Sequence, residues 1–259
     1  MANSFSVLVL SCDKYADLWK PFFECFEKRF PKGDWNIYIG TNTIKCGFPG
    51  VKTIFSGVDQ DWSTSYKRIL EQIPEQKLFV ILEDLFLASD IDKNEFLSIS
   101  DFMFQSDAMH IRYWANPYPD KETKNSLIGE CIKGAPYRST VCGFWDRQYL
   151  IDLLIDGESP WNFEIMGSYR TSYSEGFYAT KKPICRYKNI VEKGQWIPDS
   201  VEWALSNHLP ITIESRPLLK GGNQFKSRIQ MCIFDLILRI PWQFRLKLMN
   251  TLRKILISY

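Results

Sequence analysis

The chain has few of the residues that build metal centres and nucleophile–base pairs. Its two histidines, His110 and His208, lie far apart, and neither has a second His or Cys at ligand spacing. This argues against a zinc site and against a hydrolase that depends on a histidine base. The glycine-rich motifs G-x-G-x-x-G and G-x-x-x-x-G-K-[ST] are also absent. Neither dinucleotide redox chemistry nor P-loop ATP hydrolysis is therefore indicated.

Ordered cysteine spacing and long apolar runs are missing as well. The seven cysteines include no C-x-x-C, which favours reduced thiols in a cytosolic protein over a disulfide framework. The amino terminus has no basic region and only a short apolar run, so we expect a first strand there and no signal peptide. No stretch reaches the roughly 20 apolar residues that span a bilayer. The hydrophobic share of 45% still indicates a globular protein with a real core.

The first 110 residues alternate between strand and helix patterns, which predicts an α/β fold with a mainly parallel central sheet. We expect strands at Phe5–Ser11, Asn36–Gly40, Val51–Phe55, Leu78–Leu82 and Ala108–Tyr113, and helices at Asp17–Arg29, Asp61–Ile73 and Asn94–Phe104. After Trp114 the pattern loosens into a long surface loop over 115–137. Beyond it we expect strands at Thr140–Phe144, Phe177–Ala179 and Ile184–Tyr187, and helices at Asp146–Leu154, from Ser159-Pro160 onward, and near Ser200–Leu205.

One strand ends in two adjacent carboxylates. Residues 78–82 are all large and apolar, and Glu83 and Asp84 follow them directly. A run of this length suits a strand buried on both faces, and such a strand delivers its carboxyl end to the crevice where ligands of α/β sheets bind. An acidic pair there can hold a divalent cation, orient a sugar hydroxyl or accept a proton. The alternative is that the pair only caps the following turn.

Other strands of the predicted sheet are also followed by polar residues, which we expect to meet above the same edge. An aromatic face, amide and carboxylate side chains and helix N-termini together would suit a nucleotide with its diphosphate. The residues concerned are Ser11, Asp13 and Tyr15 after the first strand, Thr41 and Asn42 after the second, and Asp61, Trp62 and Ser63 before the next helix.

In the order and spacing of these motifs the chain resembles bacterial glycosyltransferases of the nucleotide-diphospho-sugar (GT-A) fold, of the sort found in O-antigen and capsule clusters. The resemblance covers residues 4–190. It rests on Ser-Cys-Asp-Lys-Tyr and Leu-Trp-Lys-Pro-Phe-Phe after the first strand, the Asp61-Trp62-Ser63 helix start, Leu-Glu-Asp-Leu-Phe-Leu, and Ser-Pro-Trp-Asn-Phe-Glu. It implies a Rossmann-like GT-A fold over 1–220, with a nucleotide-sugar-binding half (1–114) and an acceptor half (115–220), followed by an amphipathic helical tail (221–259).

The resemblance also implies roles for individual residues. The donor site would comprise the polar residues named above, with Lys67, Glu83, Asp84 and Arg112. The family's usual metal motif is Asp-x-Asp, and this chain has Glu83-Asp84-Leu85 instead. Asp84 alone could anchor Mg²⁺ or Mn²⁺ together with phosphates and water. Alternatively the diphosphate is neutralised without a metal by Lys67, Arg68, Arg112 or Arg138.

Glu164 is the candidate general base, with Asp84 as the second candidate. A transferase must deprotonate an acceptor hydroxyl while the nucleoside diphosphate leaves, so one positioned carboxylate is the minimum equipment. Aromatic neighbours would raise the pKa of Glu164 by desolvation. Trp161 could stack on an acceptor sugar, with Arg138 beside it. The alternative is that Glu164 is only a charge favoured by a helix N-terminus. We expect an inverting, hexosyltransferase-like single displacement.

The tail differs in charge from the rest of the chain. Residues 221–259 carry seven Lys or Arg against one acid, whereas residues 1–220 carry 25 basic and 29 acidic residues. Residues 225–240 and 242–257 have helical patterns with a broad apolar face and basic edges, separated by Pro241. This pattern is typical of a helix lying in a membrane interface. The alternative is a helical pair that closes the domain core.

Together these features predict a peripheral enzyme on the cytoplasmic face of the cell membrane. It would transfer a sugar to a lipid-linked saccharide during lipopolysaccharide, O-antigen or capsule synthesis, and it would have no nucleic-acid partner. Two alternatives remain at this point: a nucleotidyltransferase of similar fold, and a non-catalytic peripheral membrane protein with a degenerate nucleotide-sugar fold.

Overall fold

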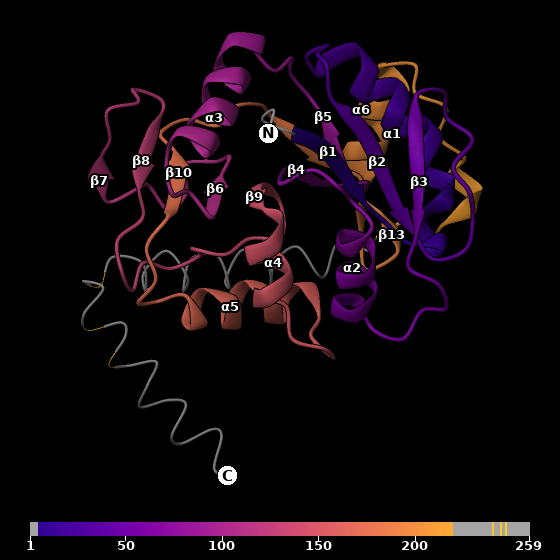
Figure 1. The fold of residues 1–259 in the computed structure, drawn as a ribbon. Helices are drawn as coiled ribbons and strands as arrows, with labels where there is room; N and C mark the ends of the chain where they lie inside the picture. Colours follow the sequence, from indigo (N-terminus) through magenta and orange to yellow (C-terminus); the bar gives the residue numbers. More distant parts are fainter. Residues whose placement is uncertain (1–4, 220–239, 241–243, 245–246, 248–259) are drawn as a thin grey trace.

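The computed structural model describes residues 5–219, Ile240, Phe244 and Lys247. Its core is a sheet of nine strands (Figure 1). In spatial order the strands are β3 (Val51–Phe55), β2 (Asn36–Thr41), β1 (Phe5–Leu10), β4 (Lys77–Leu82), β9 (Gly143–Asp146), β6 (His110–Arg112), β10 (Phe177–Thr180), β8 (Ile128–Glu130) and β7 (Lys121–Glu122).

The sheet is mixed but mostly parallel, as predicted. The strands β3, β2, β1 and β4 are parallel, and β6 pairs in parallel with β10. The strand β9 lies between β4 and β6 and runs antiparallel to both. The order β3-β2-β1-β4 is that of the first half of a doubly wound dinucleotide-binding sheet.

Helices cover both faces of the sheet. They are α1 (Ala16–Arg29), α2 (Trp62–Glu71), α3 (Lys93–Gln105), α4 (Arg147–Leu153), α5 (Pro160–Arg170) and α6 (Pro198–Ser206), with short 3₁₀ turns η1 (Asp13–Tyr15) and η2 (Ile213–Ser215). Figure 1 shows α2, α4 and α5 gathered on one side of the sheet.

The two central strands are buried on both faces because their side chains alternate between two apolar clusters. In β1, Val7 and Val9 pack in the cluster that contains α1, α3 and α6, whereas Leu8 and Leu10 pack in the cluster that contains α2 and α4. In β4, Phe79 and Ile81 alternate in the same way with Leu78 and Val80. This double burial explains the uninterrupted apolar runs in the sequence.

Several predicted elements needed correction in the second half of the chain. The strand predicted at Thr140–Phe144 is β9, which begins only at Gly143. The φ of Gly143, +147°, is costly for residues with a side chain. A Cβ added to Gly143 would lie 2.4 Å from Cε1 of His110. The predicted loop 115–137 contains β7 and β8, and the strand predicted at Ile184–Tyr187 is β11 (Tyr187–Asn189).

Two small two-stranded sheets and one β-bridge organise the segment from Tyr187 to Leu218. The strand β11 pairs antiparallel with β5 (Leu85–Leu87), which follows Asp84 directly. The hairpin of β12 (Val191–Glu192) and β13 (Gln195–Trp196) comes next, and Trp196 forms a parallel bridge with Leu218.

Three further expectations concern cysteines, membrane spans and the tail. All six cysteines in the described part of the chain are free, as expected. No described helix is both long and apolar enough to cross a bilayer. The amphipathic helices expected at 225–240 and 242–257 lie outside the described residues.

Candidate functional site

The carboxyl ends of β1 and β4 form the topological switch point of the sheet. The chain leaves β1 through α1 on one face to reach β2, and it enters β4 from α2 on the other face. At such a reversal the connections diverge and leave a crevice, which is where open α/β sheets bind ligands. Ser11 and Cys12 follow β1 at this point, and Glu83 and Asp84 follow β4.

Asp13 organises the β2 side of the crevice. Its carboxylate accepts hydrogen bonds from the backbone N–H groups of Asn42 (3.0 Å), Thr43 (3.0 Å) and Ile44 (3.1 Å) and from the Thr43 hydroxyl (2.6 Å). Desolvation raises the pKa of Asp13, but these bonds together outweigh it and leave the pKa below its ordinary value. Asp13, which was predicted to lie in the donor site, therefore holds the loop after β2 in place.

The other polar residues predicted on this rim are also engaged within the protein. The Thr41 hydroxyl donates to the carbonyl of Ile44, and the Asn42 amide donates to the Ser56 hydroxyl. The Ser11 hydroxyl accepts a hydrogen bond of 2.7 Å from the Trp19 indole N–H.

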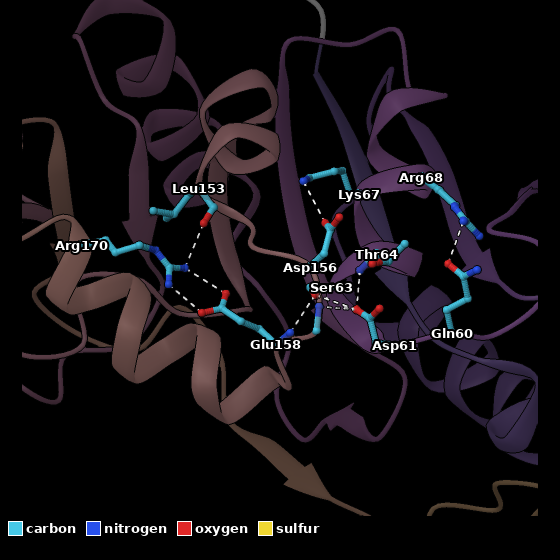
Figure 2. A network of polar contacts seen from close by, with 11 residues as sticks. Gln60, Asp61, Ser63, Thr64, Lys67, Arg68, Leu153, Asp156, Glu158 and Arg170 are labelled. Carbon is cyan, nitrogen blue, oxygen red and sulfur yellow. Dashed lines mark hydrogen bonds and ion pairs between the residues drawn. The ribbon is translucent and has the colours of Figure 1, made fainter. Parts of the chain in front are cut away.

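Asp61 and Ser63 join the start of α2 to the loop before α5 (Figure 2). Asp61 is the N-cap of α2, and its Oδ1 accepts from the Thr64 N–H at 2.9 Å, the Ser63 hydroxyl and the Gly157 N–H. The Ser63 hydroxyl in turn accepts from the Glu158 N–H. The hydrogen bond from Thr64 contributes most to lowering the pKa of Asp61. Trp62 packs its ring 5.7 Å from that of Phe163 in α5.

Lys67 and Arg68, considered above as partners of a diphosphate, contact this same region of the protein. Figure 2 shows Lys67 paired with Asp156 at 3.1 Å and Arg68 donating to Gln60. Close by, Arg170 forms a two-pronged ion pair with Glu158 at 2.6 and 2.9 Å.

Arg112 and Arg138 are buried, with 1% and 2% of their surfaces exposed. Arg112 donates to three backbone carbonyls between residues 114 and 137, and Arg138 to two in residues 172–174. Burial lowers the pKa of both guanidinium groups. Both arginines therefore hold loops against the sheet.

Glu83 and Asp84 are adjacent carboxyl groups at the end of β4, and the pKa values of both are raised. Burial raises the pKa of Glu83 well above its ordinary value, and the charge of Asp84 adds to this rise. Burial also raises the pKa of Asp84, to about 6. Asp84 Oδ1 is a buried acceptor without a hydrogen-bond partner in the described part of the chain. This orphaned oxygen at the switch point is the clearest sign that a ligand completes the site.

Arg216 supplies positive charge beside this pair, and the sequence analysis missed it. Its guanidinium forms a two-pronged ion pair with Asp17 at 2.6 and 2.8 Å and donates to the carbonyl of Lys14. It also lies 4.5 Å from the ring centre of Tyr15, and its charge lowers the pKa values of Glu83 and Asp84. No motif marks Arg216, because its partner Asp17 is far away in the sequence and the segment around Arg216 is held by backbone bonds to Trp196.

Glu164 lies on α5 and is bound to the segment just before β9. Its Oε1 accepts a hydrogen bond of 3.0 Å from the Val141 N–H, and burial raises its pKa despite that bond. After burial itself, the charges of Glu164 and Asp84 are the largest causes that raise the pKa of Cys142. Burial raises the pKa of Tyr187, and the charges of both carboxylates add to this rise. β9 pairs with β4 as far as Gly143 and Val80, so Val141, to which Glu164 is bound, lies toward the carboxyl end of β4, where Glu83 and Asp84 follow.

Trp161 does not join them. It is 67% exposed and, with Ile165 (51%) and Met166 (37%), forms an apolar patch on α5, called here the α5 patch.

The donor set limits what kind of metal the site can hold. No group of three or more His, Cys, Asp or Glu side chains suitable for a metal occurs among the described residues. Asp84 Oδ1 remains as a free oxygen ligand. Mg²⁺ is commonly held by one or two carboxylates together with substrate phosphates. The residues therefore fit a cation shared with a diphosphate, and they do not form an all-protein cage.

Comparison with known proteins finds similarity only at the level of structure. No protein-family model and no curated sequence matches the chain. Similar solved structures include S. aureus TarS 1-349 in complex with UDP, with a TM-score of 0.49 and 8% identity over 78% of this chain and 63% of that one. TarS 1-349 in complex with UDP-GlcNAc gives a TM-score of 0.44 and 10% identity over 68% and 58%. The chain thus spans less than two thirds of these structures, and no functional statement follows from a likeness of this size.

Proposed function

We propose that this chain is a glycosyltransferase that uses a nucleotide-diphosphate sugar as its donor. One observation carries the proposal: Asp84, with its orphaned oxygen, follows β4 at the switch point of a Rossmann-like sheet, and Glu164 is bound to the segment before β9 toward the same end of β4. The family resemblance in the sequence motifs supports the same class of reaction. A switch point favours a nucleotide, and two carboxylates beside it favour group transfer to a hydroxyl.

The two carboxylates would have different tasks. Glu164 accepts the proton of the acceptor hydroxyl as that oxygen bonds to the anomeric carbon of the donor sugar. The bond from this carbon to the diphosphate breaks in the same step, and the nucleoside diphosphate leaves with the electron pair. This is an inverting single displacement. Arg216 places positive charge near the leaving group.

Asp84 would bind the donor, either directly through its sugar or through a divalent cation. When bound, Mg²⁺ or Mn²⁺ would neutralise charge on the leaving diphosphate. The Oδ1 of Asp84, which has no hydrogen-bond partner among the described residues, supports this role, and burial raises the pKa of Glu83 beside it.

Donor binding provides the direct test of the proposed function. A panel of nucleotide sugars, with and without Mn²⁺, should include one that stabilises the protein by about 2.7 kcal/mol at a hundred times its Kd. For a chain of this size that corresponds to a rise in Tm of about 5–10 °C in a thermal-shift measurement. Nucleoside triphosphates serve as the control. If a triphosphate stabilised the protein and no nucleotide sugar did, the protein would instead be a nucleotidyltransferase.

We further propose that the acceptor is a lipid-linked saccharide of bacterial surface polysaccharide synthesis and that the protein binds the cytosolic membrane face. The basic, apolar composition of residues 225–259 supports membrane binding. The exposed α5 patch adds an apolar surface on the described domain.

Deletion of residues 225–259 is therefore expected to release the protein from anionic liposomes. The remaining domain keeps Arg216 and should stay folded and bind its donor. Each basic residue near such a surface contributes about 1 kcal/mol, so binding of the full chain should weaken with salt. Liposome flotation and a melting curve on the same truncated protein check both points. A truncated protein that melts early, from a parent without lipid affinity, would instead indicate a helical pair that closes the core.

A further inference from the structure

A cavity of about 770 Å³ lies where β11 meets the segment after β6 and the helix α6. Its lining combines three aromatic side chains, Trp114, Tyr187 and Trp203, with two cations, Arg186 and Lys188. The rings of Trp114 and Tyr187 are 6.4 Å apart at an angle of 49°. Aromatic faces with a few fixed polar groups are the usual make-up of a ligand pocket.

The two cations are available to a ligand. Neither Arg186 nor Lys188 forms an ion pair with any residue that the structure describes, and Arg186 is exposed. Two lysines a few residues earlier differ in this respect, because Lys181 pairs with Glu122 and Lys182 with Glu95. The positive charge in the cavity therefore has no acidic partner within residues 5–219.

The cavity adjoins the proposed catalytic site. Tyr187 pairs with Leu87 across the β5–β11 ladder, and β5 begins at the residue after Asp84. Burial raises the pKa of Tyr187, and the charges of Asp84 and Glu164 raise it further. The Ile190 N–H also donates to the Asp84 carbonyl at 2.9 Å, so a molecule held against Tyr187 would lie one short strand away from Asp84.

We propose that this cavity binds the acceptor and that the acceptor is an anionic saccharide, carrying carboxylate or phosphate groups. This inference rests on the proposed function and names its second substrate. Sugar rings would pack against the aromatic faces, and the anionic groups would pair with Arg186 and Lys188. A neutral saccharide would leave both cations without a partner. The acceptor thus binds away from Trp161 and Arg138, the residues first expected to hold it.

The test measures saccharide binding by calorimetry without donor. Three probes separate the chemistries: trigalacturonic acid carries carboxylates, glucose 6-phosphate carries a phosphate, and maltotriose is neutral. The charge variant Arg186→Gln/Lys188→Gln removes the cavity cations. The variant Lys28→Gln/Lys32→Gln removes two exposed charges that do not line the cavity and is the matched control. Tyr187→Ala removes one aromatic face.

At least one anionic probe should bind the wild-type protein about tenfold tighter than maltotriose, because two moderately exposed ion pairs are together worth about that factor. The preference should disappear in Arg186→Gln/Lys188→Gln and persist in Lys28→Gln/Lys32→Gln. Tyr187→Ala should weaken all probes alike. Which anionic probe binds better identifies carboxylate or phosphate as the recognised group.

Two results would overturn the proposal: equal affinity for neutral and anionic probes, or the same loss in both charge variants. Donor stabilisation, measured on the same proteins, separates this inference from the function on which it rests. If no nucleotide sugar stabilises the wild-type protein, the proposed function fails while the saccharide result still stands. If the donor binds and the anionic preference is absent, only the acceptor inference fails.

Discussion

Asp84→Asn is expected to abolish sugar transfer and, at pH 7.5, to raise the melting temperature of the protein. The loss of activity, about 10³-fold or more, follows from removing the free oxygen and charge that hold the donor or its cation. The gain in stability follows from the pKa of about 6 that burial gives Asp84 in the folded protein. An acid whose pKa is raised by folding destabilises the native state once it ionises.

The sign of this effect gives it a pH signature. Below about pH 4 Asp84 is protonated in both folded and unfolded chains, so variant and wild type should melt alike. Between about pH 4 and 6 the unfolded wild-type chain ionises at Asp84 while the folded chain stays protonated, so the wild type loses stability over this range, the loss is complete above about pH 6, and the variant shows none of it. After allowance for partial exposure, the difference should reach about 1–2 kcal/mol. Asp90→Asn, at an exposed position in the loop after β5, is the control for charge. If Asp84→Asn kept wild-type turnover, the assignment of Asp84 to the active site would be wrong.

Glu164→Gln is expected to lower kcat by about 10²–10⁴-fold while donor binding remains unchanged. The amide keeps an oxygen that can accept the hydrogen bond from Val141, so α5 should stay in place. Only the ability to take the acceptor proton is lost. Single-turnover kinetics with saturating donor would measure this effect, with Glu71→Gln at an exposed position of α2 as the control.

The pH profile provides an independent check on Glu164. A base must be ionised, so wild-type kcat/KM should fall as the pH drops through the raised pKa values of Glu164 and Asp84, which act on a shared site. Normal transfer by Glu164→Gln would leave Asp84 or an unnamed residue as the base. Normal transfer by both variants would favour a non-catalytic protein.

The sequence was most informative where a local pattern and the tertiary environment agree. The strands β1 and β4 are buried on both faces, so their apolar runs could be recognised without knowing their neighbours. The strand β9 could not be predicted as a reversed strand between β4 and β6, because it has only four residues and starts at a glycine with positive φ.

The same distinction holds for the candidate site. Asp84 and Glu164 were predicted from local motifs, and both lie toward the carboxyl end of β4. The partners of Asp61, Arg112 and Arg138 come from distant loops, so the sequence could not show that these side chains are already engaged. Arg216 reaches Asp17 from almost the other end of the described chain, and no local pattern predicts such a contact.

The position of β9 has a consequence for how the chain reaches its native state. While the protein is being synthesised, β4 can pair with β1, but its other edge has no partner until Gly143–Asp146 have left the ribosome. An unpaired edge on a strongly apolar strand is a site for intermolecular association. Pairing across so many residues also slows folding. A nascent chain that stops short of β9 would thus be the form most dependent on chaperones.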